Sequence, residues 1–211
     1  MNVQDILRFY SKSADTPAGY GTGETYAENS PNRSLFAELP LNFRKILSNF
    51  FVSVFTFDFY GVVGFDPLPG DTTFKSIEHA FQAAKFLLAA QVCRGSDPAR
   101  YAVFTEAAIR FTVNSGDAIG QGDGALAQKN RKLIKLRPHE ITAWNGCSER
   151  VMTIISGAAF VQCPIRRAVL LNTGDAELWH IRPRMTHVRF SHLEEIRAHL
   201  SEEPLAKRAK A

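Results

Sequence analysis

Residues 76–86 read Ser-Ile-Glu-His-Ala-Phe-Gln-Ala-Ala-Lys-Phe, and this stretch predicts a helix. At about 100° per residue, the polar side chains of Glu78, Gln82 and Lys85 fall into one stripe. Apolar side chains cover most of the remaining surface, so we expect the helix to be buried. A separate apolar row is formed by Ile77, Phe81, Ala84 and Leu88.

The polar stripe is unusual for a helix that is otherwise apolar. Stranding a charge in an apolar interior costs on the order of several kcal/mol, so Glu78 and Lys85 must be paired, hydrogen-bonded or facing a wet cavity. They lie about 10 Å apart along the helix axis, too far for the usual ion pair between positions i and i+4. Spacing alone leaves two interpretations open, a functional site or the solvated edge of an ordinary core helix.

The composition is that of a globular protein. The chain has 211 residues, of which 45% are hydrophobic and 22% charged, enough for one domain with a sizeable core. No apolar run approaches the roughly 20 residues that span a bilayer, and the N-terminus lacks a basic region followed by an apolar one. We therefore expect a soluble, intracellular protein, cytoplasmic or nuclear, without membrane contact.

Charge and cysteine usage narrow the chemistry only slightly. The formal net charge of +4 suits a polyanionic ligand without requiring one. Cys93, Cys147 and Cys163 are widely spaced and form no Cys-x-x-Cys pair, so we expect free thiols and no metal site.

Two regions before and after the 76–86 helix predict further elements. Aromatic and β-branched residues from Phe50 to Phe65 predict an antiparallel pair of strands, followed by a turn at 67–71 and a helix N-cap at Ser76. The 76–86 helix should end before Gly95, and Asp97-Pro98 predicts the start of the next helix, which residues 114–116 should end.

A glycine-rich loop over residues 116–124 precedes a predicted basic helix. Its backbone N–H groups at a helix start suit phosphate oxygens, but the loop is equally typical of a mobile connection beside a solvated basic face. It lacks the Gly-Lys-Ser/Thr ending of a nucleoside-triphosphate loop. The basic side chains expected on the following helix are Lys129, Arg131, Lys132 and Lys135.

The C-terminal part predicts helices over 149–162 and 165–172 and short strands over 176–181 and 187–190. A capping box from Ser191 to Glu194 predicts the start of a last helix. We expect an N-terminal strand and polar flexible arm over 1–34, a folded domain over 35–203 and a frayed basic tail over 204–211. The fold class is therefore α+β, a helix-dominated single domain with a small antiparallel sheet.

Five features stand in a characteristic order along the chain: Ile6–Tyr10, Leu47-Ser-Asn-Phe-Phe51, the 76–86 stretch, Trp144 and Leu170-Leu-Asn-Thr-Gly-Asp-Ala-Glu-Leu178. This series resembles the NADAR superfamily, which includes YbiA-like proteins. It is similar to that family's opening strand, Leu-Ser-Asn-Phe segment, Glu-His-x-x-Gln-x-x-Lys-Phe helix, tryptophan and Leu-Leu-x-Thr-Gly-Asp-x-x-Leu segment. The resemblance runs from about residue 6 to 200 and implies a YbiA-like catalytic domain over 35–203.

The chain departs from the family pattern after Leu178. Many members continue there with a glycine-rich Asp-x-Phe-Trp-Gly-type stretch, whereas this chain reads Trp179-His-Ile-Arg-Pro-Arg-Met185. Substrate contacts made by that stretch cannot be carried over. The resemblance is to the superfamily more than to its branch that acts on riboflavin intermediates.

The resemblance implies an enzyme that hydrolyses an N-glycosidic bond without a cofactor. Similar members remove ADP-ribose from ADP-ribosylated guanine, so the expected partners are ADP-ribosylated guanosine or DNA as substrate and ADP-ribose as product, with no obligate protein partner. One alternative is an N-glycosidase for phosphorylated riboflavin-pathway intermediates. Another is a module that binds ADP-ribose without catalysis.

Cleaving a ribosyl C–N bond requires stabilising positive charge at C1 and handling protons on the ring oxygen and the leaving base. The resemblance implies that Lys85 attacks C1, opens the ribose and forms a Schiff base that water hydrolyses. Glu78 is then the proton shuttle or the group that holds the ribose hydroxyls. Gln82 lies between them and can hydrogen-bond to either neighbour or to the substrate.

Five other residues are candidates for substrate binding. Ser48, Asn49 and Phe50 are placed to contact ribose or phosphate, although ordinary turn chemistry explains them equally well. Trp144 is either a stacking platform for a base or a core anchor. Asp175 either contacts ribose or caps the segment that follows.

Overall fold

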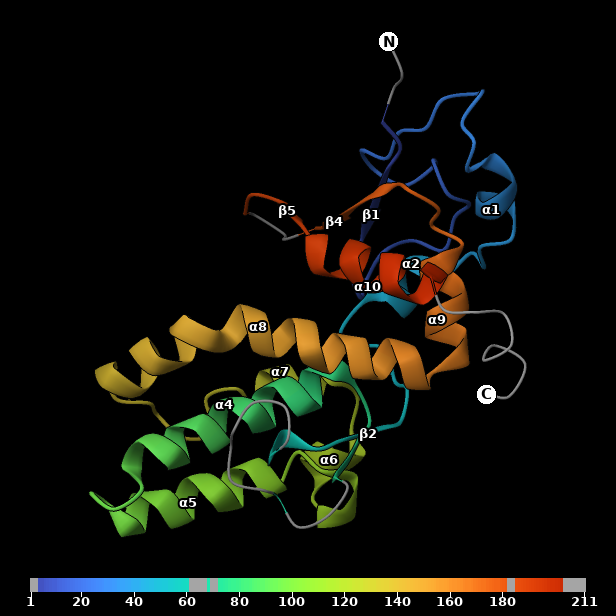
Figure 1. Ribbon diagram of the computed structural model, residues 1–211. Coiled ribbons are helices and arrows are strands. Elements are labelled where there is room, and N and C mark those ends of the chain that lie inside the picture. Colours follow the sequence, from blue (N-terminus) through green and yellow to red (C-terminus); the bar gives the residue numbers. More distant parts are fainter. Residues whose placement is uncertain (1–3, 61–67, 69–71, 182–184, 203–211) are drawn as a thin grey trace. The chain divides into compact units, whose positions relative to one another are not determined.

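The computed structural model describes residues 4–60, 68, 72–181 and 185–202 (Figure 1). The chain forms two compact units. One consists of residues 1–48 and 160–211, here called the terminal unit, and the other of residues 49–159, the central unit. Helices dominate and the strands are few and short, which confirms the predicted α+β class. The divisions between the two units fall near residues 48 and 159.

The terminal unit contains a three-stranded sheet. Strand β1 (Ile6–Phe9) pairs in parallel with β4 (Glu177–His180), which pairs antiparallel with β5 (Val188–Arg189). The strands predicted near both chain ends are confirmed, but the sheet is mixed and not purely antiparallel. Parallel neighbours need a long crossover, and the intervening chain between β1 and β4 supplies it.

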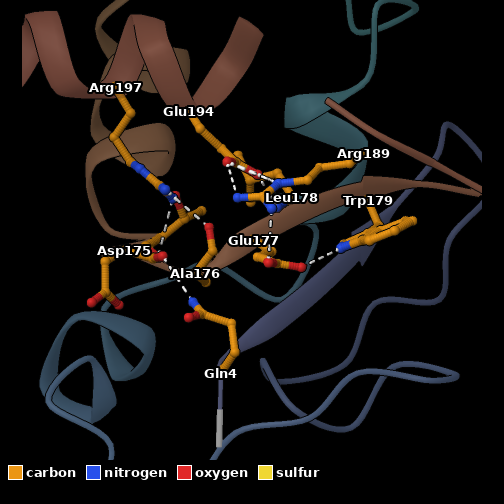
Figure 2. Close-up of polar contacts among 10 residues, drawn as sticks. Gln4, Asp175, Ala176, Glu177, Leu178, Trp179, Arg189, Glu194 and Arg197 are labelled. Carbon is orange, nitrogen blue, oxygen red and sulfur yellow. Dashed lines mark hydrogen bonds and ion pairs between the residues drawn. The ribbon is translucent and has the colours of Figure 1, made fainter. Parts of the chain in front are cut away.

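Four helices belong to the terminal unit. They are α1 (Arg33–Ala37), α2 (Phe43–Leu47), α9 (Pro164–Leu171) and α10 (Ser191–Glu202). Gly174, with a φ of 56°, follows the C-terminal end of α9. In α10, Glu194 accepts hydrogen bonds from the Leu178 N–H and the Arg189 guanidinium (Figure 2). The carboxylate expected to close a capping box therefore links the helix to β4 and β5.

Buried polar contacts hold the N-terminal arm. The Glu24 carboxylate accepts hydrogen bonds from the N–H groups of Arg8 (3.0 Å) and Gly19 (2.9 Å) and from Arg44 Nε (2.7 Å). Arg44 in turn donates to the carbonyls of Thr16 and Pro17. We expected a loosely packed arm because it has few aliphatic residues, but here hydrogen bonds to one buried ion pair replace apolar packing.

The central unit is built around a long buried helix. Helix α4 (Ile77–Cys93) packs against α5 (Pro98–Ile109), and a two-stranded antiparallel sheet joins β2 (Phe55–Phe57) to β3 (Thr72–Phe74). Ser76 and Asp97 cap the two helices as predicted. The unit also contains η1 (Val113–Ser115), α6 (Ala118–Gln121), α7 (Gly124–Lys129) and α8 (Pro138–Gln162), whose last residues belong to the terminal unit.

Three local predictions for the central unit need correction. The partner of β2 is Thr72–Phe74 and does not lie within residues 50–65, of which 61–65 are outside the described residues. The basic helix ends at Lys129, so Arg131 and Lys132 lie in a turn and Lys135 lies in irregular chain before α8. Helix α5 ends at Ile109, before the predicted stop at 114–116. Pairing partners and helix ends depend on tertiary contacts that local residue patterns do not encode.

Three further predictions concern the cysteines, the absence of membrane-spanning helices and the C-terminal tail. The three cysteines are free thiols. Within the described ranges no single helix is long and apolar enough to cross a membrane, and α8 with α9 meets that criterion only as a bent pair. The predicted tail over 204–211 lies outside the described residues.

We expect Glu24→Gln to lower the free energy of unfolding by about 3–5 kcal/mol, because it leaves the buried Arg44 guanidinium without its counter-charge. Asp15→Asn is the matched control, since it breaks the exposed Asp15–Lys45 ion pair and should cost about 0–1 kcal/mol. Urea unfolding at neutral pH measures both changes. Equal effects of the two substitutions would contradict a central role for Glu24.

Candidate functional site

The polar stripe on α4 is buried in the central unit. Glu78, Gln82 and Lys85 are 6%, 5% and 8% exposed, respectively. The helix begins where predicted, with the Ser76 side chain accepting a hydrogen bond from the His79 N–H. These low exposed fractions exclude the interpretation that the stripe is the solvated edge of an ordinary core helix.

Gln82 connects the two ionisable groups. Its Nε2 donates a hydrogen bond of 2.7 Å to Glu78 Oε1, and its Oε1 accepts one of 2.7 Å from Lys85 Nζ. An amide has a donor end and an acceptor end, so one side chain satisfies a carboxyl group and an amine that are too far apart to pair directly. Lys85 Nζ also donates to the main-chain carbonyl of Arg131.

Burial moves both ionisable groups toward their neutral forms. It raises the pKa of Glu78 above its usual value, although the Gln82 hydrogen bond and the Lys85 charge oppose the change. Burial lowers the pKa of Lys85 to about 8, although the Glu78 charge opposes that change. The site therefore favours a neutral acid and a neutral amine more than water does.

The surroundings of Lys85 suit a neutral amine. A neutral amine carries two N–H groups and one lone pair, and the described acceptors of Lys85 are also two, Gln82 Oε1 and the Arg131 carbonyl. Both N–H groups are thereby satisfied. The lone pair, which is the nucleophilic part of the group, remains available.

A buried carboxylate anchors the chain just before α8, a few residues after the turn that carries the Arg131 carbonyl. Glu140, at the start of α8, accepts hydrogen bonds from Arg100 Nε (2.6 Å) and Nη2 (2.7 Å) and from the Arg137 N–H (2.6 Å). Arg100 also donates to the Lys135 carbonyl. The Arg100 hydrogen bond, followed by the contacts to Arg137 and Cys93, lowers the pKa of Glu140 to about 2, although burial opposes this.

Sequence reasoning missed both Glu140 and the Arg131 carbonyl. Glu140 follows Pro138 in a first helical turn, which is an ordinary place for a carboxylate, and Arg100 lies on another helix. A main-chain carbonyl leaves no residue-type signal at all. The sequence did indicate that a buried Lys85 needs a hydrogen-bond acceptor, because burying an unpaired charge is costly. It did not indicate which residue supplies that acceptor.

Asn49 and Phe50 lie beside the first turn of α4. The Asn49 carbonyl accepts a hydrogen bond of 3.1 Å from the Glu78 N–H, and its side-chain nitrogen lies 3.4 Å from Met152 Sδ. Asn49 Oδ1 is buried without a hydrogen-bond partner among the described residues. A Cβ at Gly124 would collide with the Phe50 backbone, so the last glycine of the 116–124 loop permits close packing of α7.

The described contacts of the other candidates are to residues outside the polar stripe. Trp144 is buried in the central unit, with its ring centroid 4.9 Å from that of Phe81, the geometry of a core anchor. Ser48 and Asp175 belong to the terminal unit. The Ser48 carbonyl accepts from the buried Arg166.

Asp175 has partners within the terminal unit. Its carboxylate accepts a hydrogen bond from Asn32 Nδ2, and its N–H donates to Asn32 Oδ1. Figure 2 shows Gln4 reaching the Asp175 carbonyl, at 3.4 Å. These contacts favour the capping interpretation for this residue.

Within the described part of the chain, no three His, Cys, Asp or Glu side chains are grouped so as to hold a metal ion. The chemistry that the site offers comes from a carboxyl group, an amide and an amine.

Comparisons with known proteins give a likeness among solved structures. No protein-family model matches the chain, and no curated protein matches it. Among solved structures, the NMR structure of the E. coli protein YbiA is similar, with 18% sequence identity and a TM-score of 0.47, over 94% of this chain and 87% of YbiA. This likeness concerns the fold alone.

We expect the Lys85 amine to titrate with a midpoint near 8, well below the roughly 10.4 of an ordinary lysine. Reductive ¹³C-methylation followed by NMR over a pH series measures every lysine separately. Lys85→Arg identifies the resonance of Lys85 among those of the other lysines. A Lys85 midpoint above 10 would contradict the burial argument.

We expect Glu140 to make stability fall in acid. Its pKa is lowered when folded, so its stabilisation is complete above the unfolded value of about 4.5 and is lost as pH falls toward 2. Glu140→Gln should therefore flatten the fall in unfolding free energy between pH 4.5 and 3, measured by urea unfolding. An unchanged slope in this variant would argue against the Glu140 contacts.

Proposed function

We propose that the protein is an N-glycosyl hydrolase that removes ADP-ribose from ADP-ribosylated guanine, in a nucleoside or in nucleic acid, through a Schiff base on Lys85. The observation that carries this proposal is the buried chain Glu78–Gln82–Lys85, in which an acid and an amine are both moved toward neutrality. The substrate comes from the resemblance of the sequence to the NADAR superfamily.

The lowered pKa of Lys85 supplies the nucleophile. With a pKa of about 8, roughly one amine in ten is neutral at pH 7, against fewer than about one in a thousand for an ordinary lysine. The acceptors Gln82 Oε1 and Arg131 carbonyl orient the amine through its N–H groups. A module that only bound ADP-ribose would gain nothing from a buried, partly neutral lysine.

The reaction begins at ribose C1. The Lys85 lone pair forms a bond to C1 while the C1–N bond to guanine breaks and its electron pair leaves with the base. The departing base needs a proton, and Glu78, with its raised pKa, is the group that holds one. Gln82 keeps the acid and the nucleophile at fixed positions on the helix.

The second half of the reaction regenerates the amine. A proton moves from the attached Nζ to the ring oxygen as the bond from C1 to that oxygen breaks, and an imine forms between Nζ and C1. Water then adds to the imine and releases ADP-ribose. Glu78, now ionised, accepts the proton of the attacking water and returns to its starting state.

Asn49 is the best placed of the proposed binding residues. Its carbonyl is hydrogen-bonded to the Glu78 N–H, and its buried Oδ1 has no described partner. We assign this oxygen to a ribose hydroxyl, since buried acceptors are rarely left unpaired. Roles for Ser48, Phe50, Trp144 and Asp175 in binding the substrate stay predictions.

Borohydride trapping tests the proposal directly. Incubation of the protein with ADP-ribosylated guanosine and sodium cyanoborohydride should reduce the imine to a stable adduct, which peptide mass spectrometry locates on Lys85. Lys85→Arg should give neither adduct nor release of ADP-ribose, whereas Lys75→Arg, a matched control, should give both. Circular dichroism confirms that each variant is folded.

The same assay separates the alternatives. Glu78→Gln should reduce ADP-ribose release by about 10²–10⁴-fold, the usual contribution of a general acid. An adduct with a phosphorylated riboflavin-pathway intermediate, and none with ADP-ribosylated guanosine, would instead favour the metabolite glycosidase. Binding of ADP-ribose without adduct or release would overturn catalysis in favour of a binding module.

A further inference from the structure

A cavity of about 290 Å³ lies wholly within the terminal unit. Three cationic side chains line it, those of Arg8, Lys12 and Arg44, and none of its described lining residues is acidic. The other polar side chains of the lining are hydroxyl groups, from Tyr10, Ser13, Thr16, Tyr20 and Thr22. The cavity therefore combines positive charge with hydroxyl donors and acceptors.

Two of the three charges are uncompensated. Arg44 is neutralised by its buried ion pair with Glu24. In contrast, no described ion pair involves Arg8 or Lys12. Arg8 Nη1 meets His187 Nδ1 at 3.1 Å, a contact that leaves the guanidinium charge in place.

Two buried polar atoms of lining residues have no partner. They are Arg8 Nε and Thr16 Oγ1, which make no hydrogen bond among the described residues. Buried donors are almost always paired, so the Arg8 guanidinium has hydrogen-bonding capacity that the described residues do not use. Both residues border the same cavity, which places this cationic side chain next to the space that a ligand would fill.

Two glycines allow the backbone to approach the guanidinium groups. A Cβ at Gly21 would lie 2.8 Å from Arg44 Nε, and a Cβ at Gly23, where φ is +74°, would lie 2.6 Å from Arg8 Nη1. Side chains at these positions would displace both guanidinium groups. The Glu24 carboxylate accepts hydrogen bonds from the Gly19 and Gly21 N–H groups and from Arg44 Nε, and these bonds hold this part of the cavity wall in place.

We propose that this cavity binds the phosphate monoester of a small sugar phosphate. A phosphate monoester carries a charge of about −1.5 to −2 at pH 7, which matches the two uncompensated cations. Guanidinium groups pair well with phosphate oxygens, and the hydroxyl side chains suit a polyol. The volume lies at the lower end of the roughly 300–1,000 Å³ of small-molecule sites, which fits one sugar ring and not a dinucleotide.

Calorimetric titration of the full chain with glucose 6-phosphate tests this proposal. We expect saturable binding of glucose 6-phosphate, weaker binding of the singly charged glucose 6-sulfate, and none of glucose. Lys12→Gln should weaken glucose 6-phosphate binding by about fivefold or more. Lys45→Gln removes the same charge from a surface position that does not line the cavity and should change affinity by less than about twofold.

Two further variants complete the test. Arg8→Gln should weaken glucose 6-phosphate binding by about tenfold or more, since it removes one of the two uncompensated charges that line the cavity. The proposal does not depend on the chemistry of Lys85, so Lys85→Arg should bind glucose 6-phosphate as well as the unmodified chain does.

Three results would overturn the proposal. One is the absence of glucose 6-phosphate binding at millimolar concentration. Another is equal weakening by Lys12→Gln and Lys45→Gln, which would indicate general charge attraction. The third is that ADP-ribose binds more tightly than glucose 6-phosphate and loses as much affinity in Lys12→Gln, because the cavity would then serve a pyrophosphate.

Discussion

The burial of an acid and an amine on one helix is the constraint that organises the central unit. Neither Glu78 nor Lys85 can be left in an apolar interior without partners, and they are too far apart to pair with each other. Gln82 satisfies one hydrogen-bonding position on each. The remaining need of Lys85 is met from outside the helix, by the Arg131 carbonyl, so the surrounding turns must take one definite path.

In each unit a buried carboxylate also holds a stretch of irregular backbone. Glu140 collects main-chain and guanidinium donors around the turn before α8, and Glu24 does the same for the N-terminal arm. The N-terminal arm is poor in aliphatic residues and would have little reason to order by packing alone. A single ionised group in each unit thereby fixes a stretch of irregular backbone that borders a polar site or cavity.

The residue pattern predicts what depends on near neighbours. Ser76 and the periodicity after it located α4 and its stripe, because capping and helical spacing are local properties. The pairing of β2 with residues 72–74 was missed, since a strand's partner is chosen by contacts distant in sequence. The hydrogen bond from Lys85 to the Arg131 carbonyl could not be predicted from the sequence. Every residue has a main-chain carbonyl, and only the folded structure determines which one lies next to Lys85.

The burial of Lys85 also links its titration to folding. In an unfolded chain Lys85 has the pKa of an ordinary lysine and is almost entirely protonated at neutral pH. In the folded chain burial lowers that pKa to about 8. Folding near neutral pH therefore releases part of a proton from this one side chain.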